Sequence, residues 1–132
     1  MWYVPIIAGG AAFLVGALWY SPLLFGKKWQ QLKGVTDNSL DYISYQKVMG
    51  TSLLTWIFTA WITINLLLLL SIPITVYSAI LLAAVLWAGY MAPTVLSRTL
   101  YSDNHSRQLF AIDAGHDLIA VVVLSLTIAI LL

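Results

Sequence analysis

The chain has 132 residues, of which 61% are hydrophobic and 8% are charged. A soluble globular domain carries roughly 25% charged residues, and six basic plus five acidic side chains cannot cover the surface of one. The net charge of +1 argues against a nucleic acid partner, and the lack of cysteine excludes disulfides and thiolate chemistry. We therefore expect one integral membrane domain over residues 1–132, with the lipid bilayer as its partner.

Four apolar segments are each close to the 20 residues that cross ~30 Å of hydrocarbon as a helix. They cover residues 2–24, 48–70, 74–96 and 109–132. Transmembrane strands are excluded because they alternate in hydrophobicity, which these segments do not. Pro73 comes just before the third segment, where a missing N–H costs little. The predicted fold class is an all-α, four-helix transmembrane bundle.

Charged side chains occur only in two windows, residues 27–47 and 98–117. The connections between the first and second segments and between the third and fourth lie on one side of the membrane. They contain all six Lys and Arg residues, and the opposite side contains none. Because basic connections stay in the cytoplasm, we predict a multi-pass protein of the bacterial inner (cell) membrane. Both basic loops would be cytoplasmic and both termini outside.

Two prolines occupy matching positions near the cytoplasmic ends of the first and third segments. Pro22 and Pro93 each follow an aromatic residue by three positions and precede a basic residue by five. A proline within a helix leaves the carbonyl four residues earlier without its usual partner. The match predicts two repeated helical hairpins. The alternative is that proline and aromatic residues are common at the ends of membrane helices.

A row of polar residues follows the second segment. It consists of Thr51, Thr55, Thr59 and Thr63 at four-residue spacing, with Asn65 beyond them. One interpretation is the polar lining of a path. The other, which we favour, is that each hydroxyl bonds to the carbonyl four residues earlier in its own helix or to a neighbouring helix. Asn65 is a stronger polar signal, because its amide must find partners within hydrocarbon.

Small residues at four-residue spacing mark the faces through which membrane helices associate. The first and third segments carry such faces, namely Ala8, Ala12 and Gly16, and Ala84, Ala88 and Ala92. These faces predict a homo-oligomer or a complex with another membrane protein.

Three ionisable residues share one face of the fourth segment: Asp113, His116 and Asp117 stand at positions i, i+3 and i+4. Ionisable residues within a span are costly and are candidate functional sites. At 1.5 Å per residue, Asp117 lies roughly 8 Å inside the cytoplasmic boundary of the hydrocarbon, with Asp113 close to the boundary.

Three interpretations of this acidic–histidine cluster are open. The first, which we favour, is ion pairing with nearby basic residues, namely Lys27, Lys28, Lys47 or Arg98. The second is a proton or cation site, because imidazole exchanges protons near neutral pH. The third is a metal site, which would need a further ligand from another helix or subunit.

Residues 19–29 carry the pattern W-Y-S-P-x-x-F-G-x-x-W. This pattern, the His116–Asp117 pair in the final apolar segment and the four-span layout resemble domain-of-unknown-function family 1761, a family of small bacterial membrane proteins. The resemblance covers most of the chain and implies a four-helix integral membrane protein without an established activity. It marks six motif residues for packing or for a site: Trp19, Tyr20, Pro22, Phe25, Gly26 and Trp29.

No motif of a hydrolase, a metalloprotease or a phosphate-binding loop occurs in the sequence. His116 and Asp117 would need a serine from elsewhere to form a nucleophile–base pair. We therefore expect no enzyme, no cofactor and no resident metal. The first functional hypothesis is binding or passage of a proton or small cation at the acidic–histidine cluster, with Trp19 and Tyr20 at its mouth. The second is a non-catalytic accessory or scaffold protein that acts through helix–helix contacts.

Overall fold

The computed structural model describes residues 1–34, 42–102 and 106–132, and these ranges contain helices and turns but no strand. The helices in chain order are α1 (Val4–Trp19), α2 (Gly26–Lys33), α3 (Tyr42–Leu69), α4 (Val76–Leu86), the π-helix η1 (Trp87–Met91), α5 (Ala92–Tyr101) and α6 (Arg107–Leu131). The all-α prediction is therefore confirmed.

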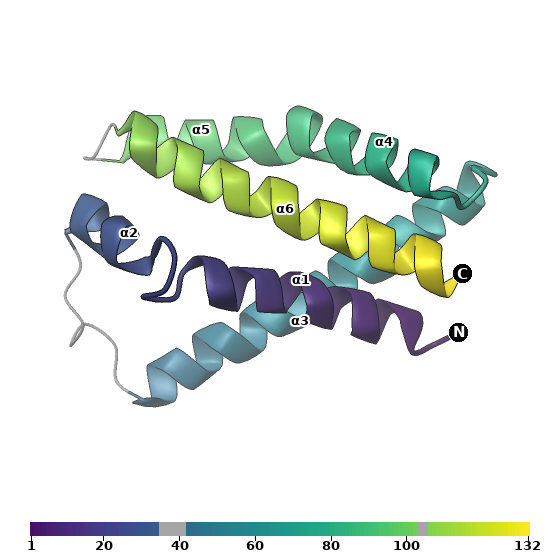
Figure 1. Cartoon of the computed structure of the whole chain (residues 1–132), viewed down its shortest axis with the longest axis horizontal. Helices are drawn as coiled ribbons and strands as arrows, with labels where there is room; N and C mark the ends of the chain where they lie inside the picture. Colours follow the sequence, from purple (N-terminus) through teal and green to yellow (C-terminus); the bar gives the residue numbers. More distant parts are fainter. Residues whose placement is uncertain (35–41, 103–105) are drawn as a thin grey trace.

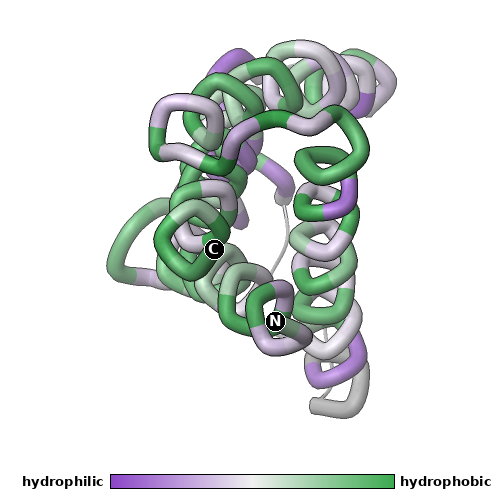
Figure 2. Tube along the Cα trace, turned by 90° about the vertical axis from the view of Figure 1, so that its right-hand side faces the viewer, coloured by the Kyte–Doolittle hydropathy of each residue, from purple (hydrophilic) through white to green (hydrophobic). Residues whose placement is uncertain are grey.

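Three helical stretches are long and apolar enough to cross a membrane: Gln46–Leu69, Val76–Tyr101 and Arg107–Leu131. Apolar residues also cover their outer faces (Figure 2), where Leu54 is 67% exposed and Val85 57% exposed. The first expected span, residues 2–24, is shorter than predicted. Helix α1 has 16 residues, about 24 Å at 1.5 Å per residue, which is less than the ~30 Å of a hydrocarbon core. Among the described residues, three helices thus meet the length and composition of a membrane span, and the predicted count of four is not confirmed.

Helix α1 ends at Trp19 because the residues after it favour a turn. The Ser21 hydroxyl donates to the Leu18 carbonyl at 2.6 Å, and Pro22 has no N–H with which to continue the helix. The Phe25 N–H then donates back to the Trp19 carbonyl at 2.9 Å. Residues 20–25 thus form a compact turn that leads into α2.

Glycine is required where this turn meets α2. A Cβ at Gly26 would collide with the carbonyl oxygens of Tyr20 and Ser21, so a larger residue would force the turn open.

Pro93 does not end a helix. The Ala92 N–H donates to the Trp87 carbonyl five residues earlier, which is the π-helical spacing, and Pro93 follows in the first turn of α5. The segments α4, η1 and α5 therefore form one continuous rod. Because Pro22 lies in a turn and Pro93 in a helix, the two matching segments of the predicted repeat differ in local structure at their prolines.

Helix α6 lies between α1 and the α4–α5 rod, and α3 crosses α1 at an angle (Figure 1). Both termini lie at one end of the bundle; we call the other end, which holds α2 and the starts of α3 and α6, the loop end (Figure 1). The core joins three helices: Val4, Ala8 and Ala12 of α1, Ala60 and Leu67 of α3, and Ala120, Leu124 and Ile128 of α6.

The small-residue face of α1 packs within the chain, not against a partner as expected. Ala8 and Ala12 are fully buried, and α1 touches the α3 backbone because a Cβ at Gly9 would lie 2.5 Å from the Ile57 Cα. On the rod, by contrast, Ala84 and Ala88 are exposed.

Candidate functional site

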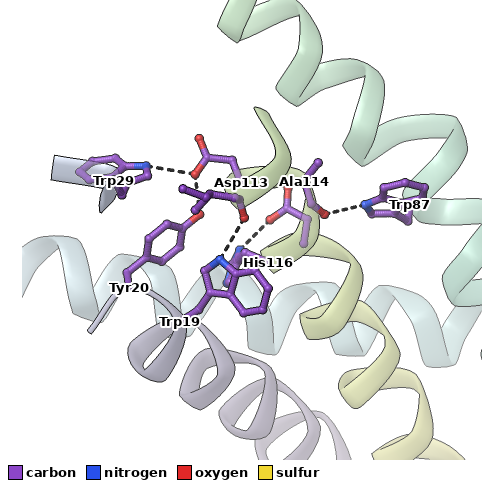
Figure 3. Close-up of polar contacts among 9 residues, drawn as sticks. Trp19, Tyr20, Trp29, Trp87, Asp113, Ala114 and His116 are labelled. Atoms are coloured by element: carbon purple, nitrogen blue, oxygen red, sulfur yellow. Dashed lines mark hydrogen bonds and ion pairs between the residues drawn. The ribbon is translucent and has the colours of Figure 1, made fainter. Parts of the chain in front are cut away.

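Aromatic donors from the end of α1, from the turn after it and from α2 bind the beginning of α6 (Figure 3). The Trp19 indole N–H donates to the Ile112 carbonyl at 3.0 Å. The Tyr20 hydroxyl and the Trp29 indole N–H both donate to Oδ1 of Asp113, at 2.7 and 3.1 Å. Asp113 is therefore held by aromatic donors rather than by a lysine or arginine.

The rod holds α6 from its other side. The Trp87 indole N–H donates to the Ala114 carbonyl at 2.8 Å (Figure 3). Phe25 supports the Trp19 side chain, since the centroids of the two rings lie 4.7 Å apart. All six motif residues thus have a structural role, because they form the turn after α1 or fix the start of α6.

His116 lies three residues after Asp113 in α6, and its imidazole contacts the next residue, Asp117. Its Nδ1 lies 2.9 Å from Oδ1 of Asp117, and its side chain is 10% exposed. The rings of Tyr20 and Trp56 lie 5.0 and 6.0 Å from the imidazole. A carboxylate can only accept, so we assign the neutral imidazole proton to Nδ1, which leaves Nε2 as a bare acceptor.

Nε2 of His116 is buried and has no hydrogen-bond partner among the residues that the structure describes. It faces α1, where a Cβ at Gly16 would lie 2.9 Å from it. Glycine at position 16 therefore makes room for the imidazole. A buried acceptor without a partner costs about 1–3 kcal/mol, which marks Nε2 as a place where a proton or a donor gains binding energy.

The acidic–histidine cluster borders a cavity of about 620 Å³ between α3, α5 and α6, which we call the loop-end cleft. Its lining includes His116 and Asp117, and opposite them Lys47, Thr55 and Arg98.

A neighbouring cavity of about 490 Å³ shares His116, Asp117 and Arg98 with the loop-end cleft and adds Asp113 and Lys33. All three residues of the acidic–histidine cluster therefore line one cavity. Three basic side chains face two carboxylates there.

The favoured ion-pair interpretation is not realised in the described part of the chain. There, no lysine or arginine nitrogen lies within 4.0 Å of Asp113 or Asp117, and His116–Asp117 is the contact that meets the ion-pair criterion. Nor do three potential metal ligands converge within residues 1–34, 42–102 and 106–132. Asp113 turns to Tyr20 and Asp117 turns to His116, so each carboxylate has a separate partner.

The threonine row bonds within its own helix, as favoured. The hydroxyls of Thr55, Thr59 and Thr63 donate to the carbonyls four residues earlier at 2.8–2.9 Å. The exposed Asn65 amide likewise donates to the Trp61 carbonyl at 2.7 Å. Thr51 and Thr55 border the loop-end cleft. The described polar groups therefore do not form a continuous lining along α3.

Two serines share a third cavity with His116 without completing a catalytic pair. Ser21 and Ser52 border this space of about 340 Å³, yet neither hydroxyl bonds to Nε2. The arrangement for nucleophilic catalysis, in which a hydroxyl donates to the base, is thus incomplete within the described residues.

Sequence reasoning did not identify the roles of Trp56 and Trp87. Both lie within apolar segments, where a tryptophan fits either packing or a polar contact. The need of a buried indole N–H for an acceptor was the available signal, but the sequence does not say which carbonyl it reaches.

A comparison with protein-family models matches residues 4–129 to the family described as "Protein of unknown function (DUF1761)". No curated protein and no solved structure matches the chain. The matched residues include the motif residues 19–29 and the acidic–histidine cluster. They also include α3, α5 and all but the last two residues of α6, the helices that border the loop-end cleft. The chain therefore belongs to the DUF1761 family.

Proposed function

We propose that this protein binds a proton at the His116–Asp117 pair and does not pass it across the membrane. The observation that carries the proposal is the bare, buried Nε2 of His116 beside polar space, with Nδ1 held by Asp117. Such a pair presents one imidazole nitrogen as a base, while the carboxylate stabilises the imidazolium that forms.

The surroundings of His116 favour a proton over a metal ion. The ring centroids of Tyr20 and Trp56 lie 5.0 and 6.0 Å from that of the imidazole, within the ~6 Å over which an aromatic ring attracts a cation. The adjoining 340 Å³ cavity has room for water, which would accept from a new Nε2–H. Lys33, Lys47 and Arg98 act against every cation there. A metal ion would need several ligands to overcome them, whereas a proton needs one nitrogen.

We infer binding without passage because α1 and the part of α6 beyond Asp117 contain no charged residue or histidine. Helix α6 continues for fifteen residues beyond His116, about 22 Å, and contains no charged residue or histidine after Asp117. Helix α1 has none at all. The α6 residues here pack into the apolar core. A relay of charged or histidine side chains therefore has no members in α1 or in α6 beyond Asp117.

We place the loop end in the cytoplasm of a bacterial cell, at the inner membrane, with both termini outside. All six basic residues fall in the two loop-end windows of the sequence, as the Lys/Arg rule requires. Helix α1 would be a fourth, short span, with local thinning of the bilayer covering the difference in length.

Tryptophan fluorescence tests the proton site, because an imidazolium quenches a nearby indole. We expect the difference signal between wild type and Trp56→Phe to fall as the pH is lowered from 8 to 5. His116→Gln abolishes that fall, whereas His105→Gln, which removes the other histidine, leaves it intact. A fall that survives His116→Gln would refute the proposal.

Proteoliposomes test the absence of passage. With a pH gradient imposed, vesicles with protein should lose it no faster than empty vesicles. A faster loss that Asp117→Asn abolishes would show that the site conducts, against our proposal.

A second candidate function, as a scaffold for another membrane protein or a second copy, is favoured by the exposed Ala84 and Ala88. Close helix approach needs small residues. Ala88→Leu should then disrupt assemblies detected by crosslinking in membranes, and Val85→Leu, at another exposed position of the rod, should not. Equal effects of the two variants would remove this candidate.

A further inference from the structure

We propose that the loop-end cleft holds the head group of an anionic phospholipid, with its phosphodiester between Arg98 and Lys47. This binding uses the basic side of the cleft, whereas proton uptake uses His116 on the opposite side. The two proposals can therefore fail independently.

Arg98 and Lys47 are cations without a carboxylate partner in the described part of the chain. Both are exposed and both border the loop-end cleft, yet neither has an acidic oxygen within 4.0 Å there. Lys33 differs, since its ammonium lies over the Trp29 ring at 5.6 Å. A phosphodiester supplies the missing negative charge, and an arginine can hold two of its oxygens at once.

The depth of the two cations matches the level of lipid phosphates. Lys47 is the second residue of the spanning stretch Gln46–Leu69, and Arg98 lies three residues before the end of Val76–Tyr101. Three residues correspond to about 4.5 Å of helix. Both cations thus lie at the loop-end boundary of the apolar region, where head groups meet hydrocarbon.

The cleft is open along α3 and has apolar as well as polar walls. Val48 is 50% exposed, and Thr51 and Thr55 are exposed as well. Trp56 closes the deeper wall. In Figure 1 the beginning of α3 lies apart from the α5–α6 pair. A lipid can enter from the side with its phosphate at the cations and its acyl chains along α3.

The charge of the cleft selects an anionic lipid over a zwitterionic one. Arg98 and Lys47 outnumber the Asp117 carboxylate, so a head group with net charge −1 neutralises the cleft. Asp117 would accept from a hydroxyl of a glycerol head group, and it would repel a second negative charge. Phosphatidylglycerol has this chemistry.

Lipid binding to the purified full chain, measured by native mass spectrometry, tests the proposal. Phosphatidylglycerol and phosphatidylcholine with the same acyl chains are the probes. At about fivefold per basic residue, two cations predict roughly 25-fold tighter binding of phosphatidylglycerol. Equal binding of the two lipids would overturn the proposal.

Charge-removing variants locate the site. Arg98→Gln and Lys47→Gln should each weaken phosphatidylglycerol binding about fivefold. The matched control is Lys28→Gln, which removes an exposed charge from α2 without touching the cleft, and it should change binding less than twofold. Arg98→Lys keeps the charge and should recover most of the affinity, which separates the loss from a folding defect. A loss as large in Lys28→Gln contradicts the assignment.

Competition distinguishes a lipid from a soluble anion. Inorganic phosphate and glycerol phosphate, at millimolar concentration, should not displace phosphatidylglycerol, because they lack the acyl chains that lie along α3. Complete displacement by either would overturn the lipid assignment. The fluorescence response of His116 to pH serves as the separate test of proton uptake.

Discussion

The bonds to Asp113 predict an energetic coupling between the turn after α1 and the start of α6. Asp113→Ala leaves two donors without an acceptor, the Tyr20 hydroxyl at 2.7 Å and the Trp29 indole N–H at 3.1 Å. A hydrogen bond to a charged group contributes about 1.5–3 kcal/mol. Because these bonds are only partly buried, we take the lower value for each and expect a loss of about 3 kcal/mol.

A double-mutant cycle isolates the Tyr20–Asp113 bond. Tyr20→Phe alone should lower the free energy of unfolding in mixed micelles by about 1.5 kcal/mol. The double variant should lose about 3 kcal/mol, less than the sum of the single losses, so the coupling energy is about 1.5 kcal/mol. Tyr90→Phe, at an exposed tyrosine, is the control and should be additive with Asp113→Ala. If the losses of Tyr20→Phe and Asp113→Ala also added, within about 0.5 kcal/mol, the Tyr20–Asp113 coupling would be refuted.

Three further substitutions test the packing that positions the site. Gly9→Ala should destabilise the protein by about 1–3 kcal/mol because its Cβ would meet the α3 backbone, whereas Gly10→Ala, which meets open space, should not; equal unfolding energies would contradict the α1–α3 contact. Gly16→Ala should displace His116 at a similar cost and alter the histidine signals in NMR spectra, and an unchanged spectrum would refute the Gly16–His116 contact. Trp87→Phe should cost about 0.5–1.5 kcal/mol in unfolding free energy through the lost bond to α6, and no loss would show that this bond is dispensable.

The amino-acid sequence predicts the helical class and the membrane character well, because composition and segment length decide both. It does not predict where α1 ends. Pro22 and Pro93 have similar neighbours, yet one lies in a turn and the other in a helix. The outcome depends on bonds that only the folded chain supplies: the Ser21 hydroxyl donates to the Leu18 carbonyl in the turn, and the π-helical spacing accommodates Pro93 in the rod.

The sequence predicts the candidate site only in part, because the partners of its residues are also set by contacts that form in the folded chain. Helical spacing places Asp113, His116 and Asp117 on one face, and in the structure all three line one cavity. The partners of the two carboxylates are not predicted, since charge alone favours lysine and arginine. The turn after α1 instead brings Tyr20 and Trp29 to Asp113, and that contact depends on a tight turn that hydrophobicity does not encode.

Nitrogen NMR of the imidazole tests the central claim, that His116 presents a bare Nε2 as a proton-binding base. The protein would carry ¹⁵N-labelled histidine and His105→Gln, which leaves His116 as the sole histidine, and would be placed in lipid nanodiscs. We predict the neutral Nδ1–H tautomer at pH 8 and conversion to the imidazolium as the pH is lowered to 5. An Nε2–H tautomer at pH 8, or a neutral imidazole throughout this range, would contradict the claim.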